Sequence, residues 1–177
     1  RLFSKAGLRP GDALYLTKPI GTGMIVSGAR QGKTRPEWLA GATASMLRLN
    51  RHAMHLARAA GVRAATDVTG FGLLGHLWEM ASRSEVAVEL EAAAVPLLEG
   101  ARESCVLGVH TGGEVRNREW AAPHVDFGPN VDTDVAALLF DPQTSGGLLI
   151  AVGPRKAAAL EAAFARDGAP VWRIGRV

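Results

Sequence analysis

The sequence predicts a layered α/β or α+β domain. Apolar runs of strand length alternate with longer segments of helical spacing, which is typical of a sheet covered by helices. The composition indicates an ordinary folded domain, because 47% of the 177 residues are hydrophobic and 21% are charged. A chain of this length can bury one sizeable core, and no internal repeat or low-complexity segment interrupts the pattern.

The first third of the chain predicts one strand and three helices. Residues 13–18 form a strand that begins after a Gly-Asp turn and ends at a proline. A short helix is expected over residues 21–29. Pro36 suits the first turn of a helix over 37–50, and a further helix over 52–60 ends at a glycine.

The middle third predicts two strands, two helices and a loop. Residues 62–68 predict a buried strand, and the apolar spacing of residues 72–82 predicts a helix directly after it. Residues 86–90 alternate like a strand, and 96–106 predicts a helix. Residues 108–123 are the least regular, so we expect a long loop there.

The last third begins with a predicted edge strand at residues 124–127. Asp132 or Thr133 can cap a compact helix that ends at Phe140. The remaining elements are a strand at 148–152, an alanine-rich helix at 154–166 and a final strand at 171–177.

The most informative stretch is TDVTGFGLLGHL, residues 66–77, where the buried strand runs into a helix. A helix start presents unpaired N–H groups and the positive end of the helix dipole, which suit phosphate. A carboxylate beside it suits the metal ion that accompanies phosphate. Asp67 is therefore our candidate Mg²⁺ ligand, although the same spacing also fits a helix-capping aspartate.

The neighbours of Asp67 are candidate cofactor-binding residues. Thr66 and Thr69 could bond phosphate or cap the helix, and Gly70 permits close backbone approach or serves as an ordinary turn glycine. For His76, one helical turn further on, a core or surface role is favoured over catalysis.

A second segment, DPQTSGG at residues 141–147, offers a carboxylate, an amide, two hydroxyls and two glycines. Its N–H groups could form an anion nest, or the segment could simply connect a helix to a strand. The polar stretch 112–118 could reach substrate phosphate or remain a solvated loop. Cys105 fits a buried thiol better than a nucleophile, and His52 with His55 lacks partners for a zinc site.

Composition also excludes several classes of function. The net charge of +3 and the 6% aromatic content argue against nucleic-acid binding, and no apolar run is long enough for a membrane span. A single cysteine excludes an internal disulfide and favours a reducing, cytoplasmic location. We expect residues 1–12 to be a linker from an absent N-terminal domain and 13–177 to be the domain itself.

The two long motifs, at residues 66–76 and 141–149, resemble the signatures of the selenophosphate synthetase (selenide, water dikinase) family. The stretches 17–23, 94–96 and 112–117 resemble that family too, so the similarity spans nearly the whole chain. Together the two long motifs separate the chain from aminoimidazole ribonucleotide synthetase, thiamine-monophosphate kinase and a hydrogenase maturation factor.

The resemblance covers only the C-terminal domain of that family. It implies a mixed β-sheet packed against helices, similar to the C-terminal domain of aminoimidazole ribonucleotide synthetase. It also implies a homodimeric, Mg²⁺-dependent enzyme that converts ATP, selenide and water to selenophosphate, AMP and phosphate for selenocysteine and selenouridine synthesis. Asp67 matches a magnesium ligand, whereas the reactive cysteine or selenocysteine, the catalytic lysine and most ATP contacts belong to the N-terminal half.

The resemblance therefore implies half an active site and an inactive fragment. Two alternatives stay open at this point. One is a non-catalytic anion-binding or regulatory module, and the other is a different ATP-dependent synthetase or kinase of the same superfamily.

Overall fold

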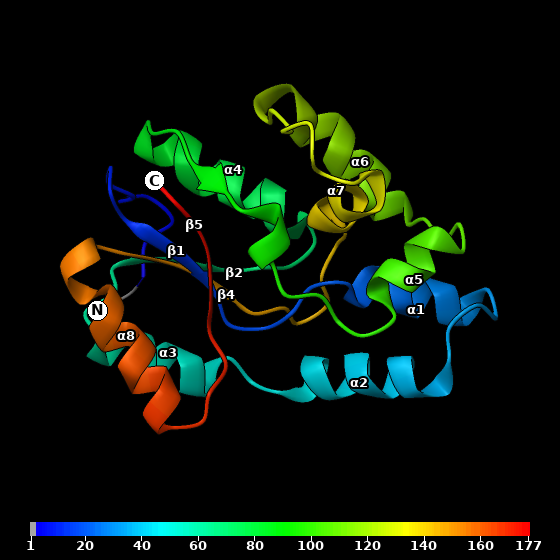
Figure 1. The fold of residues 1–177 in the computed structure, drawn as a ribbon, viewed down its shortest axis with the longest axis horizontal. Coiled ribbons are helices and arrows are strands. Elements are labelled where there is room, and N and C mark those ends of the chain that lie inside the picture. Colours follow the sequence, from blue (N-terminus) through cyan, green and yellow to red (C-terminus); the bar gives the residue numbers. More distant parts are fainter. Residues whose placement is uncertain (1–2) are drawn as a thin grey trace.

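A computed structural model describes residues 3–177 and shows an α+β domain built on one five-stranded sheet (Figure 1). The strand order is β2-β4-β1-β5-β3, and all four ladders are antiparallel. The strands are β1 (Ala13–Leu16), β2 (Ala64–Asp67), β3 (Glu89–Leu90), β4 (Leu148–Val152) and β5 (Trp172–Arg176). Residues 1 and 2 of the predicted linker lie outside the described residues.

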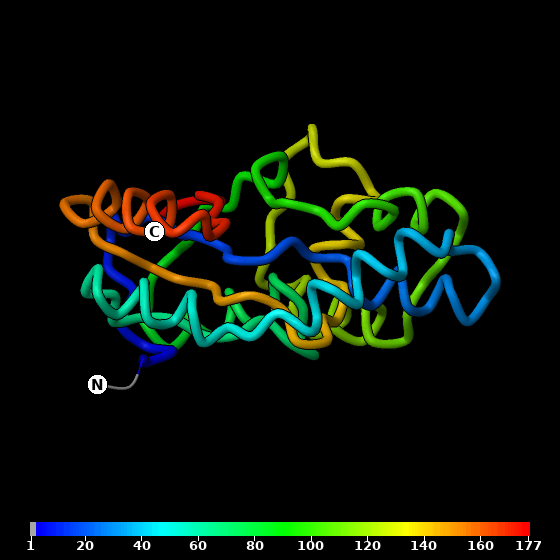
Figure 2. The backbone as a smooth tube through the Cα atoms, turned by 90° about the horizontal axis from the view of Figure 1, so that it is seen from below, coloured from blue at the N-terminus to red at the C-terminus, as the bar shows by residue number. Residues whose placement is uncertain are grey.

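Eight α-helices surround the sheet in the described part of the chain. They are α1 (Thr22–Arg30), α2 (Pro36–Leu47), α3 (Arg51–Ala59), α4 (Gly72–Ser84), α5 (Ala101–Val106), α6 (Gly112–Ala121), α7 (Thr133–Phe140) and α8 (Pro154–Arg166). Helices α3 and α8 lie side by side at one corner, while α1, α5, α6 and α7 gather at the opposite end (Figure 1). Helices α2 and α3 follow one long side of the molecule (Figure 2).

The sheet separates two hydrophobic cores because successive side chains of a strand point to opposite faces. In β1, Leu14 and Leu16 join the larger core, whereas Ala13 and Tyr15 join the smaller one. The larger core contains side chains of α1, α4 and α7, and the smaller core contains side chains of α3 and α8. All five residues of β4 are buried, as expected for a central strand covered on both faces.

The predicted α+β class is confirmed. The resemblance implied a mixed sheet, whereas every ladder between the five strands is antiparallel. Parallel pairing in residues 3–177 is limited to two isolated bridges, Ser4 with Ala64 and Ile20 with Leu97. The second bridge explains why the helix predicted over 96–106 begins only at Ala101. The backbone of residues 96–98 pairs with Ile20 instead, and Gly100 has a φ of 83° that starts the helix late.

The long loop predicted over residues 108–123 is wrong, because most of it is helix α6. Thr111 caps this helix by accepting a hydrogen bond from the Glu114 N–H at 2.9 Å. The sequence Thr-Gly-Gly-Glu has the spacing of a capping box, a signal that the two glycines obscure. The edge strand predicted at 124–127 is also wrong, since a 3₁₀ turn (Ala122–His124) leads into a segment that pairs with no strand.

The strand predicted at 86–90 shortens to the two residues of β3. Within residues 3–177, no helix combines the length and the apolar character needed to cross a membrane.

Gly72 and Gly70 provide a matched test of the turn before α4. Gly72 has a φ of 70°, and a Cβ there would lie 2.6 Å from the Phe140 carbonyl oxygen. A Cβ at Gly70 would meet no atom within 4 Å. We expect Gly72→Ala to lower the free energy of unfolding in urea by roughly 2–4 kcal/mol, and Gly70→Ala by less than about 0.5 kcal/mol. Equal losses for the two variants would contradict this account of the turn.

Candidate functional site

The two long sequence motifs lie side by side. Strand β2 ends at Asp67, whose backbone pairs with Leu148 of β4. Immediately after the strand, the Val68 N–H donates to the Gly147 carbonyl at 2.9 Å. The Gln143 N–H then donates to the Thr69 carbonyl, also at 2.9 Å. Segments more than seventy positions apart in the sequence therefore form one continuous surface.

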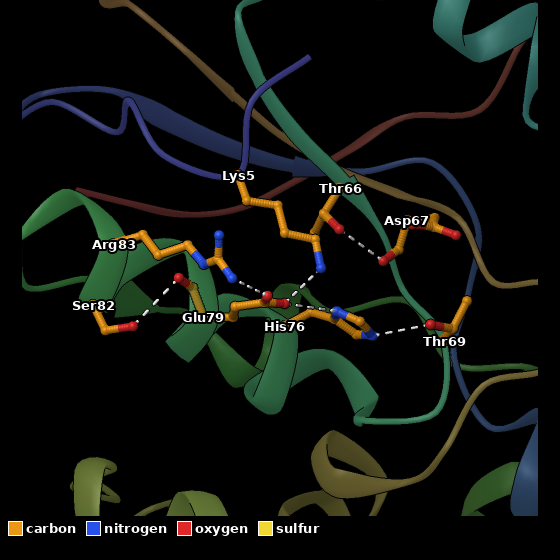
Figure 3. Close-up of polar contacts among 8 residues, drawn as sticks. All are labelled: Lys5, Thr66, Asp67, Thr69, His76, Glu79, Ser82 and Arg83. Carbon is orange, nitrogen blue, oxygen red and sulfur yellow. Dashed lines mark hydrogen bonds and ion pairs between the residues drawn. The ribbon is translucent and has the colours of Figure 1, made fainter. Parts of the chain in front are cut away.

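Asp67 has an exposed side chain, and its carboxylate accepts no hydrogen bond within residues 3–177. The N-cap residue of α4 is Phe71, without a side-chain cap, so the helix-capping interpretation of Asp67 is wrong. The Thr66 hydroxyl is buried and donates to the Asp67 carbonyl at 3.2 Å (Figure 3). A free carboxylate at the end of a fixed strand can therefore take a ligand from solvent.

The turn after Asp67 is held by side chains from two helices, α4 and α6. The Thr69 hydroxyl lies 3.1 Å from His76 Nε2, so it does not cap the helix. Asn117 of α6 donates from Nδ2 to the Gly70 carbonyl at 2.8 Å and to the Phe140 carbonyl at 2.9 Å. The Gly70 N–H makes no hydrogen bond with residues 3–177. This turn consequently combines a rigid backbone with an unused donor.

His76 is 3% exposed and lies between Thr69 and Glu79 (Figure 3). Burial is the largest cause of its lowered pKa, and the charge of Lys5 lowers the pKa further. The charges of Glu79 and Asp67 act in the opposite direction. The ring is therefore neutral near pH 7, which agrees with the expected core role of this histidine.

The segment 141–147 connects α7 to β4 and also caps another helix. Asp141 Oδ2 accepts hydrogen bonds from the N–H groups of Gly23 at 3.0 Å and Met24 at 3.2 Å. Gln143 Oε1 accepts from the N–H groups of Gly21 at 3.0 Å and Thr22 at 3.2 Å. These are the orphan donors at the start of α1, so their partners come from a distant segment. The carboxylate and the amide thus face protein and not an external anion.

Burial raises the pKa of Asp141 to about 7. The hydrogen bonds from Met24, Gln143 and Gly23 act in the opposite direction but do not outweigh the loss of solvent. One carboxyl oxygen, Oδ1, is buried without a hydrogen-bond partner in the described part of the chain. Asp141 therefore has the environment of a structural carboxyl, in contrast to the exposed Asp67.

Lys18 and Asn50 are site-supporting residues that sequence reasoning missed. The Lys18 side chain is 2% exposed, and its Nζ donates to the Ser145 carbonyl at 2.7 Å. Burial, followed by the charge of Arg48, lowers its pKa. Asn50 Nδ2 donates to the Gly146 carbonyl at 2.8 Å. Neither residue carries a local sequence signal, because their partners lie about a hundred positions away.

The other residues noted in the sequence are not brought to this site. Cys105 is half-buried in α5, and burial raises the pKa of its thiol to about 12, which disfavours the nucleophilic thiolate. His52 at the start of α3 lies 3.2 Å from Asp167, which follows α8. No group of three or more His, Cys, Asp or Glu residues is suited to a metal ion within residues 3–177.

The chain matches the family described as "AIR synthase related protein, C-terminal domain" over residues 9–177. Several similar curated proteins are named "Selenide, water dikinase". The protein from Pelobacter propionicus is 43% identical over 168 residues, which cover 95% of this chain and 48% of that protein. The protein from Nitratidesulfovibrio vulgaris (strain Miyazaki F) is 42% identical over 179 residues, covering 99% and 51%. The chain spans about half the length of the curated relatives it matches.

Solved structures share the fold at lower sequence identity. A hydrogenase maturation protein HypE superimposes with a TM-score of 0.70 at 23% identity, covering 98% of this chain and 46% of that one. Thiamine-monophosphate kinase from Stenotrophomonas maltophilia K279a superimposes with a TM-score of 0.67 at 21% identity, covering 98% and 49%. A further HypE structure, with a TM-score of 0.65 at 21% identity over 98% of this chain and 44% of that one, is a complex with ATP.

The raised pKa of Asp141 predicts a specific pH dependence of stability. The folded state keeps the carboxyl protonated up to about pH 7, whereas the ordinary value is 3.8. The contribution of the protonated Asp141 carboxyl to the free energy of unfolding is therefore fully present below about pH 4. It is lost as the pH rises through about 7. The free energy of unfolding of the native chain minus that of Asp141→Asn should fall between these limits, by up to roughly 1.4 kcal/mol per pH unit.

Urea unfolding of both proteins across pH 4 to 8 measures this difference, and other titrating groups largely cancel in the subtraction. A difference that stays constant or rises over this range would contradict the assignment.

Proposed function

Since this chain belongs to the AIR synthase related family as a C-terminal domain, we propose that it is the C-terminal half of a selenophosphate synthetase. The proposed reaction of the whole protein converts ATP, selenide and water to selenophosphate, AMP and phosphate. The proposal includes Mg²⁺ as cofactor and a homodimeric, cytoplasmic enzyme. Its main support is the sequence identity of about 40% to curated selenide, water dikinases over most of this chain.

The free carboxylate of Asp67 is the structural observation that carries the proposed role of this half. Magnesium usually takes one or two protein carboxylates and completes its coordination with phosphate oxygens and water. An exposed carboxylate without a hydrogen-bond partner in the described residues fits one such ligand. Bound Mg²⁺ would neutralise phosphate charge during phosphoryl transfer.

The turn after Asp67 is suited to contact the nucleotide. The unused Gly70 N–H can donate to a phosphate oxygen, and no neighbouring atom crowds Gly70. Thr66 and Thr69 complete the proposed cofactor-binding turn: the buried Thr66 fixes its geometry, and Thr69 contributes a hydroxyl that lies 3.1 Å from His76 Nε2.

Apolar surface beside this turn supports the idea of half a site. Phe71 and Trp120 are 52% and 47% exposed, and their ring centroids lie 5.4 Å apart. Exposed apolar groups that gather around a polar site are typical of a surface that another body covers. We propose that the half of the relatives' length that this chain does not span provides that cover, together with the reacting groups.

The similarity to HypE and thiamine-monophosphate kinase keeps a second candidate function, another ATP-dependent kinase or synthetase of this fold. The higher identity to selenide, water dikinases favours the selenophosphate synthetase proposal. A non-catalytic anion-binding module has less support, because the carboxylate and amide of segment 141–147 are used within the protein. Such a module should bind Mg-ATP alone, whereas half a site should bind it poorly in calorimetry.

Replacing Asp67 should abolish turnover without loss of the fold. In the full-length protein we expect Asp67→Asn to reduce selenide-dependent AMP formation at least about a hundredfold, equivalent to roughly 3 kcal/mol of transition-state stabilisation. The matched control is Asp126→Asn, another exposed aspartate outside the site, which should keep native turnover. Native turnover by Asp67→Asn would remove this carboxylate from the mechanism.

The isolated 177-residue chain should not catalyse selenide-dependent AMP formation. Its described residues hold one candidate metal ligand and no metal-binding cluster, so the reacting phosphate cannot be fully positioned. An assay of AMP formation with ATP, selenide and Mg²⁺ should detect product only when the other half of the protein is present. Product formed by the isolated chain would refute the half-site proposal.

A further inference from the structure

An apolar groove of about 890 Å³ lies beside the edge strand β3. Side chains of α4 and α7, among them Leu74, Leu77 and Leu139, form its floor. One wall is the segment 85–90, which ends in β3, and the other wall is the segment 124–128. None of the four candidate residues in the turn around Asp67 lines this groove. The groove is therefore a feature that the proposed function does not use.

Both walls of the groove are anchored to the helices beneath them. Trp78 of α4 stacks on His124, with ring centroids 4.0 Å apart and the ring planes 12° from parallel. Phe127 meets Phe140 of α7 edge to face, with centroids 6.0 Å apart. In the other wall, alternate side chains pack against the larger core: Val86, Val88 and Leu90. The groove is therefore preformed, as small-ligand and peptide sites usually are.

The two walls also present free backbone groups. Strand β3 pairs with β5 along one edge only, because it is the last strand of the sheet. The N–H groups of Ala87 and Val88 make no hydrogen bond within residues 3–177, and neither do those of Asp126 and Phe127. A strand edge with unpaired peptide groups and alternating side chains is a template for one more strand. The groove thus offers an extended peptide both an apolar floor and main-chain partners.

The charges around the groove indicate which kind of peptide it accepts. Its lining contains three carboxylates, those of Glu85, Glu89 and Asp126, and no lysine or arginine. Glu89 is paired with Arg176 at 2.6 Å, whereas Glu85 and Asp126 have no ion-pair partner among the described residues. These carboxylates attract a cationic peptide. They also disfavour pairing with the same edge of a second copy, because that would bring like charges together.

We propose that this groove binds an extended cationic peptide of another protein, which adds as a strand beside β3. The peptide alternates apolar residues, which face the floor formed by α4 and α7, with lysines or arginines, which face Glu85 and Asp126. Its main chain pairs with the free groups of Ala87 and Val88 and so provides affinity, while the alternating side chains provide specificity. The inference is independent of the proposed function, because Asp67 and its neighbours take no part in it.

Calorimetry with the full-length protein tests the class of ligand. The probe is the capped hexapeptide Val-Lys-Val-Lys-Val-Lys, whose valines lie on one face of an extended chain. The matched peptide with glutamate in place of lysine should bind at least about tenfold more weakly. The lysine peptide with every backbone nitrogen methylated keeps its charges but loses its main-chain donors, and it should lose at least about tenfold in affinity. Equal binding of the methylated peptide would refute strand addition.

Charge reversal tests whether the peptide binds in this groove. Glu85 and Asp126 are exposed, so the double variant Glu85→Lys with Asp126→Lys should fold. It should bind the lysine peptide at least about tenfold more weakly than the native protein and should prefer the glutamate peptide. The control Glu99→Lys changes another exposed carboxylate, outside the groove lining, and should keep the native preference. Native affinity for the lysine peptide in the double variant would overturn the inference.

Amide hydrogen exchange in the native full-length protein tests the pairing without any variant. Saturating lysine peptide should slow exchange of the Ala87 and Val88 amides at least about tenfold, because both become hydrogen-bonded. Unchanged exchange at both amides would overturn the inference. If both amides are already protected without peptide, another part of the protein or a second copy occupies the groove, and the inference is likewise overturned.

Discussion

The capping of α1 by a distant buried carboxyl is the interaction on which the rest of the structure depends. Asp141 and Gln143 satisfy four backbone N–H groups at the start of that helix. Gln143 also donates its own backbone N–H to the Thr69 carbonyl. One short segment therefore fixes both the helix after β1 and the turn after β2. Burial disfavours the charged form of Asp141 and so raises the pKa of its carboxyl. The local hydrogen bonds offset part of this desolvation cost.

This arrangement separates the roles of two aspartates. Asp141 is enclosed and bonded to protein, so it builds the scaffold. Asp67 stands at the end of β2 with its carboxylate free, so it can act on a ligand. Between them, Asn117 joins the Gly70 and Phe140 carbonyls and holds the turn in place. The backbone around Asp67 is fixed, and its exposed carboxylate is open to a ligand from solvent.

Periodic and motif signals predicted the α+β class, and the resemblance to selenophosphate synthetase is confirmed by the family match and the curated relatives. Where local signals failed, tertiary contacts decided the outcome. Gly112 and Gly113 hid the capping box of α6, and pairing with Ile20 delayed the start of α5. Spacing alone also left two roles open for Asp67 and for segment 141–147, because burial depends on contacts between segments far apart in the sequence.

The most direct test of the central claim is a crystal structure of the full-length protein with Mn²⁺ and a non-hydrolysable ATP analogue. Anomalous scattering would locate the metal independently of any assumption about the site. We expect a manganese peak at about 2.0–2.2 Å from an Asp67 carboxylate oxygen, with phosphate oxygens and groups from the other half of the protein as the remaining ligands. A bound metal that leaves Asp67 directed to solvent would contradict this expectation.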